Sequence, residues 1–286
     1  MKRHKWFGWT LAAIMTGASF TACTNETEEV FAQENQIKLS SVIIPASRVT
    51  SLEYQSTQIV SGQKVGITIT NAQSDHKNIA WTVGEDGTLT NTEAPVYYGN
   101  NAVTITAYHP HNSAWTGMSY EFSVNTDQSN EANYRNSDLL WTTATSSKTE
   151  NAVPLKFTHK LAKINVSLTS EESDLSNATI YVCGTNISAS FNPTTGILST
   201  SSNCVTDIKA GITKKDAYTA SAIIIPQKLF KETKLIKIQH NGKEFSYILP
   251  EDKEFISGKS YSYILNIKSN GIEVQATGSD FTGGWN

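Results

Sequence analysis

The stretch LKFTHKLAKINVSL, residues 155–168, decides the fold class of this chain. Apolar and polar side chains alternate along it with a period of two, which is typical of a β-strand with one buried face. The alternation changes phase, because the apolar residues stand at positions 155 and 157 in the first half and at 162, 164, 166 and 168 in the second. A bulge or kink near His159 and Lys160 would reconcile the two halves.

The same alternation extends over most of the chain from Ile37 onward. Its apolar positions include Val65, Ile67 and Ile69; Val103 and Ile105; Tyr120 and Phe122; Ala222 and Ile224; and Tyr261, Tyr263 and Leu265. Segments rich in Asn, Gly, Ser and Asp separate these runs, as hairpin connections require, and no segment of ten or more residues has the helical period. The sequence therefore predicts an all-β protein whose short strands pack face to face as β-sandwiches.

A polar segment between Asp127 and Pro154 predicts the boundary between two domains. One strand, from Asp138 to Thr142, interrupts this segment and would close the first sandwich. The length of the chain suits two ordinary domains. We therefore expect an N-terminal β-sandwich over residues 37–150 and a C-terminal β-sandwich over residues 151–286.

The N-terminus has the three parts of a secretory signal. Basic residues at positions 2–5 precede a mostly apolar segment from Trp6 to Phe20, and small residues lead to Cys23. About 15 apolar residues are too few for a membrane span, which needs about 20. Residues 20–23, Phe-Thr-Ala-Cys, are similar to the lipobox of bacterial lipoproteins. They predict a signal peptide over residues 1–22 and a lipid on Cys23, with a plain signal peptide as the alternative.

Residues 23–36 contain four glutamates and few apolar side chains. This composition predicts a flexible acidic tether. Together with a lipid on Cys23, it predicts a protein anchored in the outer membrane and displayed at the cell surface.

The net charge and the remaining cysteines limit the possible partners. A net charge of −3 provides no basic field of the kind that attracts nucleic acid, so nucleic acid is not an expected partner. Cys183 and Cys204 are either joined in a disulfide, worth about 3 kcal/mol by the chain-entropy model, or buried free thiols. Spacing alone does not distinguish these alternatives.

Several of these stretches together resemble the fimbrillin family. They are the lipobox at Cys23, a first strand followed by an arginine (residues 37–48), Gly-x-x-Val-Gly-Ile (62–67), Tyr-x-Pro (108–110), and above all Asp-Leu-Leu-Trp (138–141) with Phe-x-His-Lys-Leu-Ala-Lys-Ile (157–164). The resemblance covers nearly the whole chain after the signal. Members of the family are subunits of type V pili, have two transthyretin-like β-sandwich domains and reach the surface as lipoproteins.

The resemblance also implies a route of assembly. In the family, a protease cuts after an arginine that follows the first strand, and an extended segment of the next subunit fills the groove by strand addition. It implies cleavage between Arg48 and Val49 by an arginine-specific protease, with other pilin subunits as partners. A C-terminal segment would be the donor, unless it stays as the last strand of its own domain; its candidate residues are Ile272, Val274, Ala276, Phe281 and Trp285.

Two other classes of function remain open at this point. One is a monomeric surface lipoprotein that binds glycan or host protein through exposed aromatic residues such as Trp115. The other is a secreted hydrolase. His109 and His111 flank Pro110 at a spacing that suits a metal, but no cysteine or carboxylate cluster completes a site.

Other candidate catalytic residues also lack a recognisable context. His159 belongs to no nucleophile motif, and Glu171, Glu172 and Asp174 are typical of a solvated turn. We therefore expect no enzyme activity, no metal and no cofactor. The sequence favours a fimbrial subunit that supports adhesion.

Overall fold

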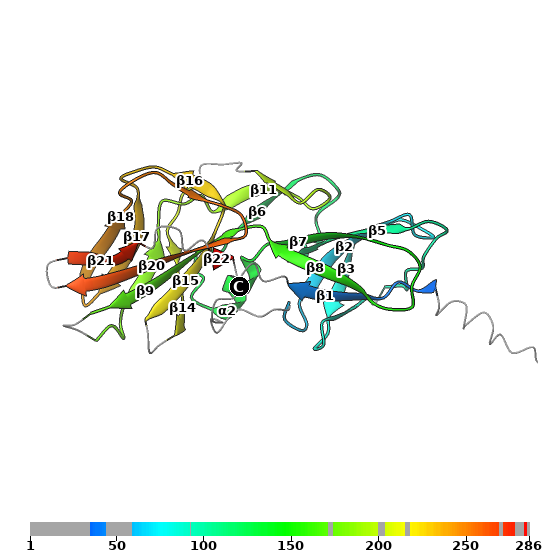
Figure 1. Cartoon of the computed structure of the whole chain (residues 1–286), viewed down its shortest axis with the longest axis horizontal. Coiled ribbons are helices and arrows are strands. Elements are labelled where there is room, and N and C mark those ends of the chain that lie inside the picture. Colours follow the sequence, from blue (N-terminus) through cyan, green and yellow to red (C-terminus); the bar gives the residue numbers. More distant parts are fainter. Residues whose placement is uncertain are drawn as a thin grey trace, which may run out of the picture.

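A computed structural model of the chain describes residues 35–43, 59–91, 93–170, 174–199, 204–214, 218–268, 271–277 and 283–284. The described chain forms two β-rich lobes arranged along one long axis, and many of the longer strands run roughly along that axis (Figure 1). A short helix, α2 (Glu131–Asn136), lies at the waist between the lobes. The all-β prediction is confirmed.

The first lobe is a closed barrel of seven strands. Its order around the barrel is β1-β4-β3-β2-β5-β7-β8. The strands are β1 (Leu39–Ile43), β2 (Lys64–Thr70), β3 (His76–Val83), β4 (Thr88–Thr90), β5 (Val103–His109), β7 (Leu140–Ser146) and β8 (Val153–His159). Val65, Ile67 and Ile69 of β2 are all fully buried in the barrel core, as the period-two pattern predicts.

The second lobe contains four sheets around a separate hydrophobic core. Their strand orders are β13-β10-β17-β18, β14-β15-β9-β20-β21 with β22 also on β20, β12-β11-β6, and β16-β19. The strands are β6 (Tyr120–Ser123), β9 (Ala162–Thr169), β10 (Thr179–Val182), β11 (Ser188–Asn192), β12 (Ile197–Ser199), β13 (Ile208–Lys209), β14 (Gly211–Lys214), β15 (Thr219–Ile224), β16 (Gln227–Leu229), β17 (Lys234–His240), β18 (Lys243–Ile248), β19 (Lys253–Phe255), β20 (Lys259–Lys268), β21 (Gly271–Thr277) and β22 (Gly283–Gly284).

The stretch 155–168 joins the two lobes. Its first half is β8 of the barrel, and its second half is β9 of the second lobe. Of the predicted bulge or kink near His159 and Lys160, the structure has a bend at Leu161 and no register shift in the ladders that β8 forms with β1 and β9 with β20. The phase changes there because the chain leaves one core and enters another, so the buried face is set anew. Strand pairing places this change after His159.

Strand β7 contains most of the segment predicted to close the first domain, and it does so by pairing with β5 and β8. Strand β6 was not expected to leave the barrel. It pairs with β11 of the second lobe, so the chain visits that lobe between β5 and β7 and then returns. Period-two alternation reports which face is buried but not which strand is the neighbour.

An aromatic cluster fastens the waist. The ring of Tyr108 in β5 packs edge-on against the ring of Trp115, with centroids 5.8 Å apart. Its centroid lies 6.1 Å from that of Phe191 in β11. The Tyr108 hydroxyl donates to the side-chain oxygen of Asn78 at 2.8 Å, and burial raises the pKa of Tyr108 to about 12. Residue 66 has to be glycine here, because a Cβ would overlap the Tyr108 ring. One barrel strand thereby contributes to the core of the second lobe.

Candidate functional site

Strand β1 closes the barrel by lying between β8 and β4. It pairs in parallel with β8, from Leu39 opposite Val153 to Ile43 opposite Phe157, and in antiparallel fashion with β4. It is therefore bonded on both sides, as an interior strand is. β1 is also the first strand of the described chain, and the other barrel strands all follow it in sequence.

The inward side chains of β1 are almost fully buried. They are Ile37 just before the strand, Leu39, Ser41 and Ile43. Ser41 is 1% exposed, and its hydroxyl donates to the carbonyl of Gly87 at 3.1 Å. Val42, on the other face, is exposed. The alternation predicted for this strand is confirmed.

The C-terminal strand β21 pairs with the outer edge of β20. The register runs from Lys268 opposite Gly271 to Tyr263 opposite Thr277, with an irregularity in the middle. The glycines of β22 lie opposite Lys259 and Ser260 on the same edge. Residues Ile272, Val274 and Ala276 therefore lie on a strand of their own lobe in this structure, and β21 is the end strand of its sheet.

Several predicted site residues lie outside the described residues. These are Cys23, Arg48, Val49, Phe281 and Trp285, together with Glu171 and Glu172. Asp174 is exposed and accepts hydrogen bonds from Ser176, at 2.9 Å from its amide and 2.7 Å from its hydroxyl. These bonds hold the pKa of Asp174 below its usual value, as in a solvated turn.

Cys183 and Cys204 are both free, so the possible disulfide is absent. Cys183 is buried, whereas Cys204 is exposed. The strand register explains the separation. Val182, next to Cys183, lies opposite Ile208, whereas the backbone carbonyl of Cys204 accepts a hydrogen bond from the backbone amide of Ile187. The two cysteines are therefore about three rungs apart along the paired strands. Three rungs amount to about 10 Å, more than the Cα separation of about 7 Å that a disulfide allows.

A buried polar cluster occupies the waist, where the chain crosses between the lobes. Asp138 Oδ1 and His159 Nδ1 lie 2.8 Å apart. Lys163, only 1% exposed, begins the second-lobe half of the same motif. Burial lowers the pKa of Lys163 to about 7, while the charge of Asp138 acts in the opposite direction. Sequence reasoning missed Lys163, because a lysine among alternating residues is usually on the solvent face.

His109, His111 and Trp115 make contacts within the fold. His109 is buried, with Nδ1 3.0 Å from the carbonyl of Lys64, and burial lowers its pKa. His111 Nε2 lies 3.3 Å from the carbonyl of Asn78. No group of three or more metal-ligating side chains occurs among the residues that the structure describes. Trp115 is 5% exposed, so the expectation of an exposed, ligand-binding tryptophan is wrong: contact with Tyr108 buries it.

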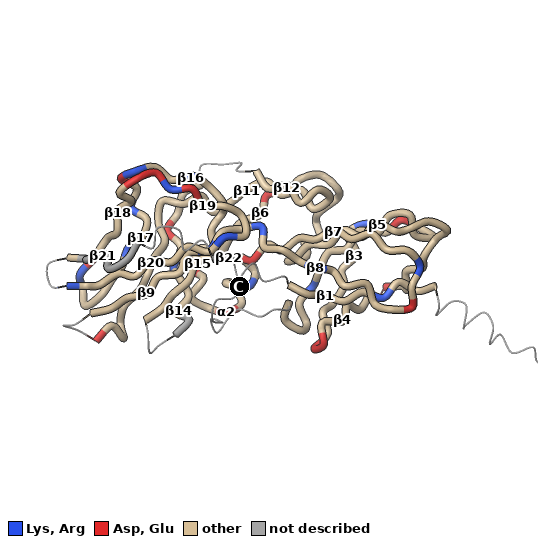
Figure 2. The backbone as a smooth tube through the Cα atoms, viewed as in Figure 1, with Lys and Arg blue, Asp and Glu red and all other residues tan. Residues whose placement is uncertain are grey.

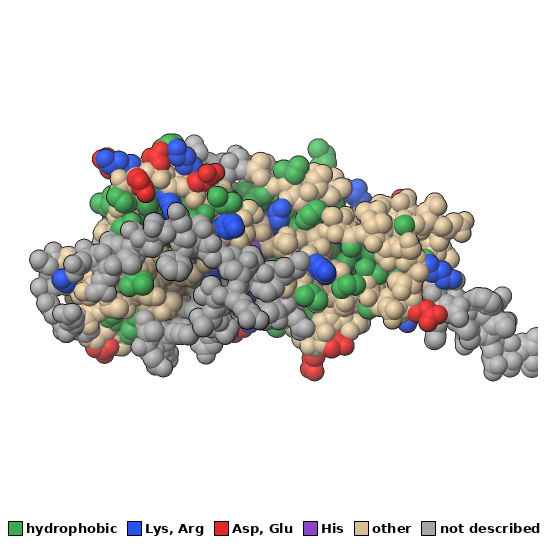
Figure 3. Space-filling model, in the orientation of Figure 1, with side chains coloured by type: hydrophobic (Ala, Val, Ile, Leu, Met, Phe, Trp, Pro, Cys, Tyr) green, Lys and Arg blue, Asp and Glu red, His purple; other side chains and the backbone are tan. Residues whose placement is uncertain are grey.

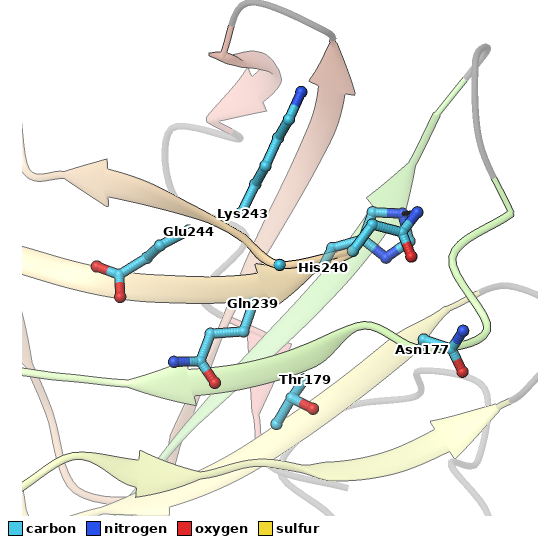
Figure 4. Close-up of a pocket in the computed structure, with 8 residues that line it drawn as sticks. Asn177, Thr179, Gln239, His240, Lys243 and Glu244 are labelled. Atoms are coloured by element: carbon cyan, nitrogen blue, oxygen red, sulfur yellow. Dashed lines mark hydrogen bonds between the residues drawn. The ribbon is translucent and has the colours of Figure 1, made fainter.

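A pocket of about 460 Å³ lies at the end of the β17–β18 hairpin (Figure 4). Thr179, Gln239 and Glu244 form one rung across β10, β17 and β18, and His240 pairs with Lys243 in the next. Side chains of neighbouring rungs point to opposite faces of a sheet, and Figure 4 shows Gln239 and Lys243 extending in opposite directions. The polar groups therefore diverge, unlike those of a small-molecule site.

The surface carries charges of both signs. Figure 2 shows acidic and basic residues intermixed in the loops near β16, β18 and β19. Hydrophobic side chains form small groups on the visible face of both lobes (Figure 3). Within the described part of the chain, no helix has the length and hydrophobicity needed to cross a bilayer.

The chain is similar to known proteins in both sequence and fold. Residues 47–280 match the model of the family described as "Fimbrillin-like". The chain is 23% identical to the "Putative fimbrium subunit Fim1C" of Bacteroides uniformis, over 96% of this chain and 95% of that protein.

Two solved structures of similar fold come from Bacteroides species. A "putative cell adhesion protein" from Bacteroides ovatus superposes with a TM-score of 0.67 at 18% identity, covering 85% of this chain and 95% of that one. Another from Bacteroides uniformis gives a TM-score of 0.64 at 19% identity, covering 84% and 95%. The match to the family model spans most of the sequence, and this chain belongs to the fimbrillin-like family.

Proposed function

We propose that this chain is a surface fimbrial subunit that polymerises by losing β1 and accepting a strand from another copy. The observation that carries the proposal is the position of β1. It is a strand of a closed barrel with a neighbour on each side, yet it is the first strand of the described chain, and every other barrel strand follows it in sequence. A single cut in residues 44–58, after Arg48, would turn an interior strand into a replaceable peptide.

Loss of β1 would leave a groove that accepts a strand. One wall would be β8 and the other β4, each with unpaired main-chain groups on the side that faced β1. The floor would be the pockets of the inward β1 side chains. Unpaired strand edges that flank an apolar groove are the arrangement that strand addition uses.

The position of the C-terminal segment supports one direction for the donor strand. Strand β20 ends at the far end of the second lobe, and β1 begins at the far end of the barrel (Figure 1). In a head-to-tail stack, residues 271–277, once released from β20, would enter the neighbouring barrel where β1 begins. The donor would then run parallel to β8, as β1 does.

Side-chain size supports the same direction. In chain order, the inward positions of β1 hold two large side chains, a small one and another large one: Ile37, Leu39, Ser41 and Ile43. Positions 272, 274 and 276 of the donor hold Ile, Val and Ala, which in parallel alignment place Ala at the small site of Ser41. The Ile43 site would meet Gly278. With all three donor residues inside these four sites, both registers of the reverse direction place Val or Ile at the small site, where volume is limited, whereas one of the two parallel registers avoids this.

The same proposal includes export and anchoring. A lipid on Cys23 would hold the unprocessed chain in the outer membrane, and cleavage after Arg48 would release it from residues 23–48 and its lipid. The alternative function, a monomeric surface lipoprotein that binds glycan through Trp115, has no support because the Trp115 side chain is buried.

Treatment of the purified chain with an arginine-specific protease tests the proposal. Cleavage between Arg48 and Val49 should be followed by detergent-resistant oligomers of high mass. Arg48→Lys should block both steps. Arg135→Lys is the matched control, because Arg135 lies in α2, bonded to Glu131 at 2.8 Å, and should leave both unchanged. Complete cleavage at Arg48 with a protein that stays monomeric would sink the proposal.

A further inference from the structure

We infer that this chain is built to bear tension along its long axis, and that residues 153–169 form the continuous segment that transmits the tension between the lobes. The inference rests on the proposed function in one respect, since a head-to-tail polymer is pulled along this axis. The mechanical property itself belongs to the single chain. It follows from three features of the waist and its flanking strands.

The first feature is continuity. Strands β8 and β9 are separated by only two residues, Lys160 and Leu161. The Lys160 amide donates to the carbonyl of Leu139 at 2.8 Å, and the Lys160 carbonyl accepts from the Ser257 hydroxyl at 2.8 Å. The Leu161 carbonyl accepts from Gly258 at 2.7 Å. The crossing is thus a two-residue segment with a bend at Leu161, held by three hydrogen bonds to neighbouring segments, and not a slack linker.

The second feature is the direction of the neighbouring strands. In the barrel, β8 is paired in parallel with β1; in the second lobe, β9 is paired in parallel with β20, from Ser260 opposite Lys163 to Asn266 opposite Thr169. Both pairs run the same way along the long axis (Figure 1). Most other pairings in the chain are antiparallel hairpins or ladders.

Parallel pairs respond to axial pulling in a particular way. Tension would enter β9 at its N-terminal end from β8 and leave β20 at its C-terminal end, Lys268. The two strands are then pulled from opposite ends, so the evenly spaced bonds of the ladder share the load as shear. Pulling both strands from the same end would instead break the bonds one after another.

The third feature is lateral bracing at the waist. The Trp141 indole donates to the carbonyl of Pro193 at 2.8 Å, and Lys160 lies over the Trp141 ring at 5.4 Å from its centroid. Asp138 and His159 pair beside them. These contacts keep the lobes in line, so that force follows residues 153–169.

Single-molecule force spectroscopy on the full chain tests the inference. All variants carry Cys23→Ser and Cys204→Ser, because Cys183 is buried and does not compete for thiol handles. Asn151→Cys with Lys268→Cys pulls β9 and β20 from opposite ends. Asn151→Cys with Lys259→Cys is the matched control, because it pulls the same two strands from the same end. Circular dichroism and the thermal midpoint confirm that each variant is folded.

We expect a several-fold higher rupture force for the 151/268 pair than for the 151/259 pair at the same loading rate. Forced rupture depends on the barrier to unfolding, so equilibrium stability does not set this difference. Equal forces, or a first rupture whose length gain corresponds to release of β8 from the barrel, would overturn the inference. The chain stays unprocessed throughout, so failure here leaves the Arg48 test of assembly unaffected, and the reverse also holds.

Discussion

Removal of β1 should cost the barrel most of its stability, and this can be measured without any polymer. The perturbation is a chain that begins at Val49, compared with one that begins at Cys23. Ile37, Leu39 and Ile43 are each at least 94% buried. Burial of such side chains stabilises by roughly 1.5–3 kcal/mol each, which gives about 5–9 kcal/mol before the loss of two hydrogen-bonded ladders. A typical domain has only about 5–15 kcal/mol.

The assay is thermal and urea unfolding followed by circular dichroism and tryptophan fluorescence. The shorter chain should lose the cooperative transition of the barrel, while the second lobe, which has its own core, retains its transition. Added peptide 35–48 should restore the barrel transition in proportion to its concentration. The same peptide with Leu39→Asp is the control and should not restore it. A shorter chain that stays monomeric with an unchanged midpoint would refute the reasoning.

Three further predictions concern the waist and the proposed groove. Lys163→Met should raise the thermal midpoint at pH 7, because it removes a buried amine whose pKa falls from about 10.4 in the unfolded chain to about 7 in the folded state. Between these two pH values the folded state binds fewer protons than the unfolded state, so the wild type should gain stability as pH rises and the variant should not. Gly196→Ala should destabilise by about 1–3 kcal/mol, since its Cβ would come within 2.5 Å of Trp141, whereas Gly242→Ala, also at positive φ but with open space, should cost less in urea titrations. In oligomers of the processed protein, Thr277→Cys on the donor should form a disulfide with Lys156→Cys on the acceptor, because Val42 lies opposite Lys156 and residue 277 would replace Val42. Glu273→Cys is the control and should form no disulfide with Lys156→Cys. Cross-linking only through position 273 would show that the donor runs in the reverse direction.

The sequence predicts the elements of this fold better than their partners. Strand β2 could be predicted because its buried face carries apolar side chains at every second position, Val65, Ile67 and Ile69. The pairing of β1 with β8 joins residues more than 110 positions apart, and no local pattern encodes it. The small and polar residues that flank Trp115 predict an exposed side chain; a contact with Tyr108, near the end of the preceding strand β5, buries it instead.

The stretch 155–168 shows what a change of phase means physically. A strand that stays in one sheet keeps its buried face, and a bulge shifts that face by one residue at the cost of a disrupted ladder. Here β8 and β9 keep regular ladders on both sides of the shift, with Phe157 and Ile164 both fully buried, each in a different core. The extra residues are the crossing itself, and Lys160 and Leu161 bond to both lobes there. A phase change within a long alternating stretch can therefore mark a junction between two cores. At this junction, the side chain of His159 is 7% exposed and pairs with Asp138, and Lys163 is 1% exposed and feels the charge of the same carboxylate.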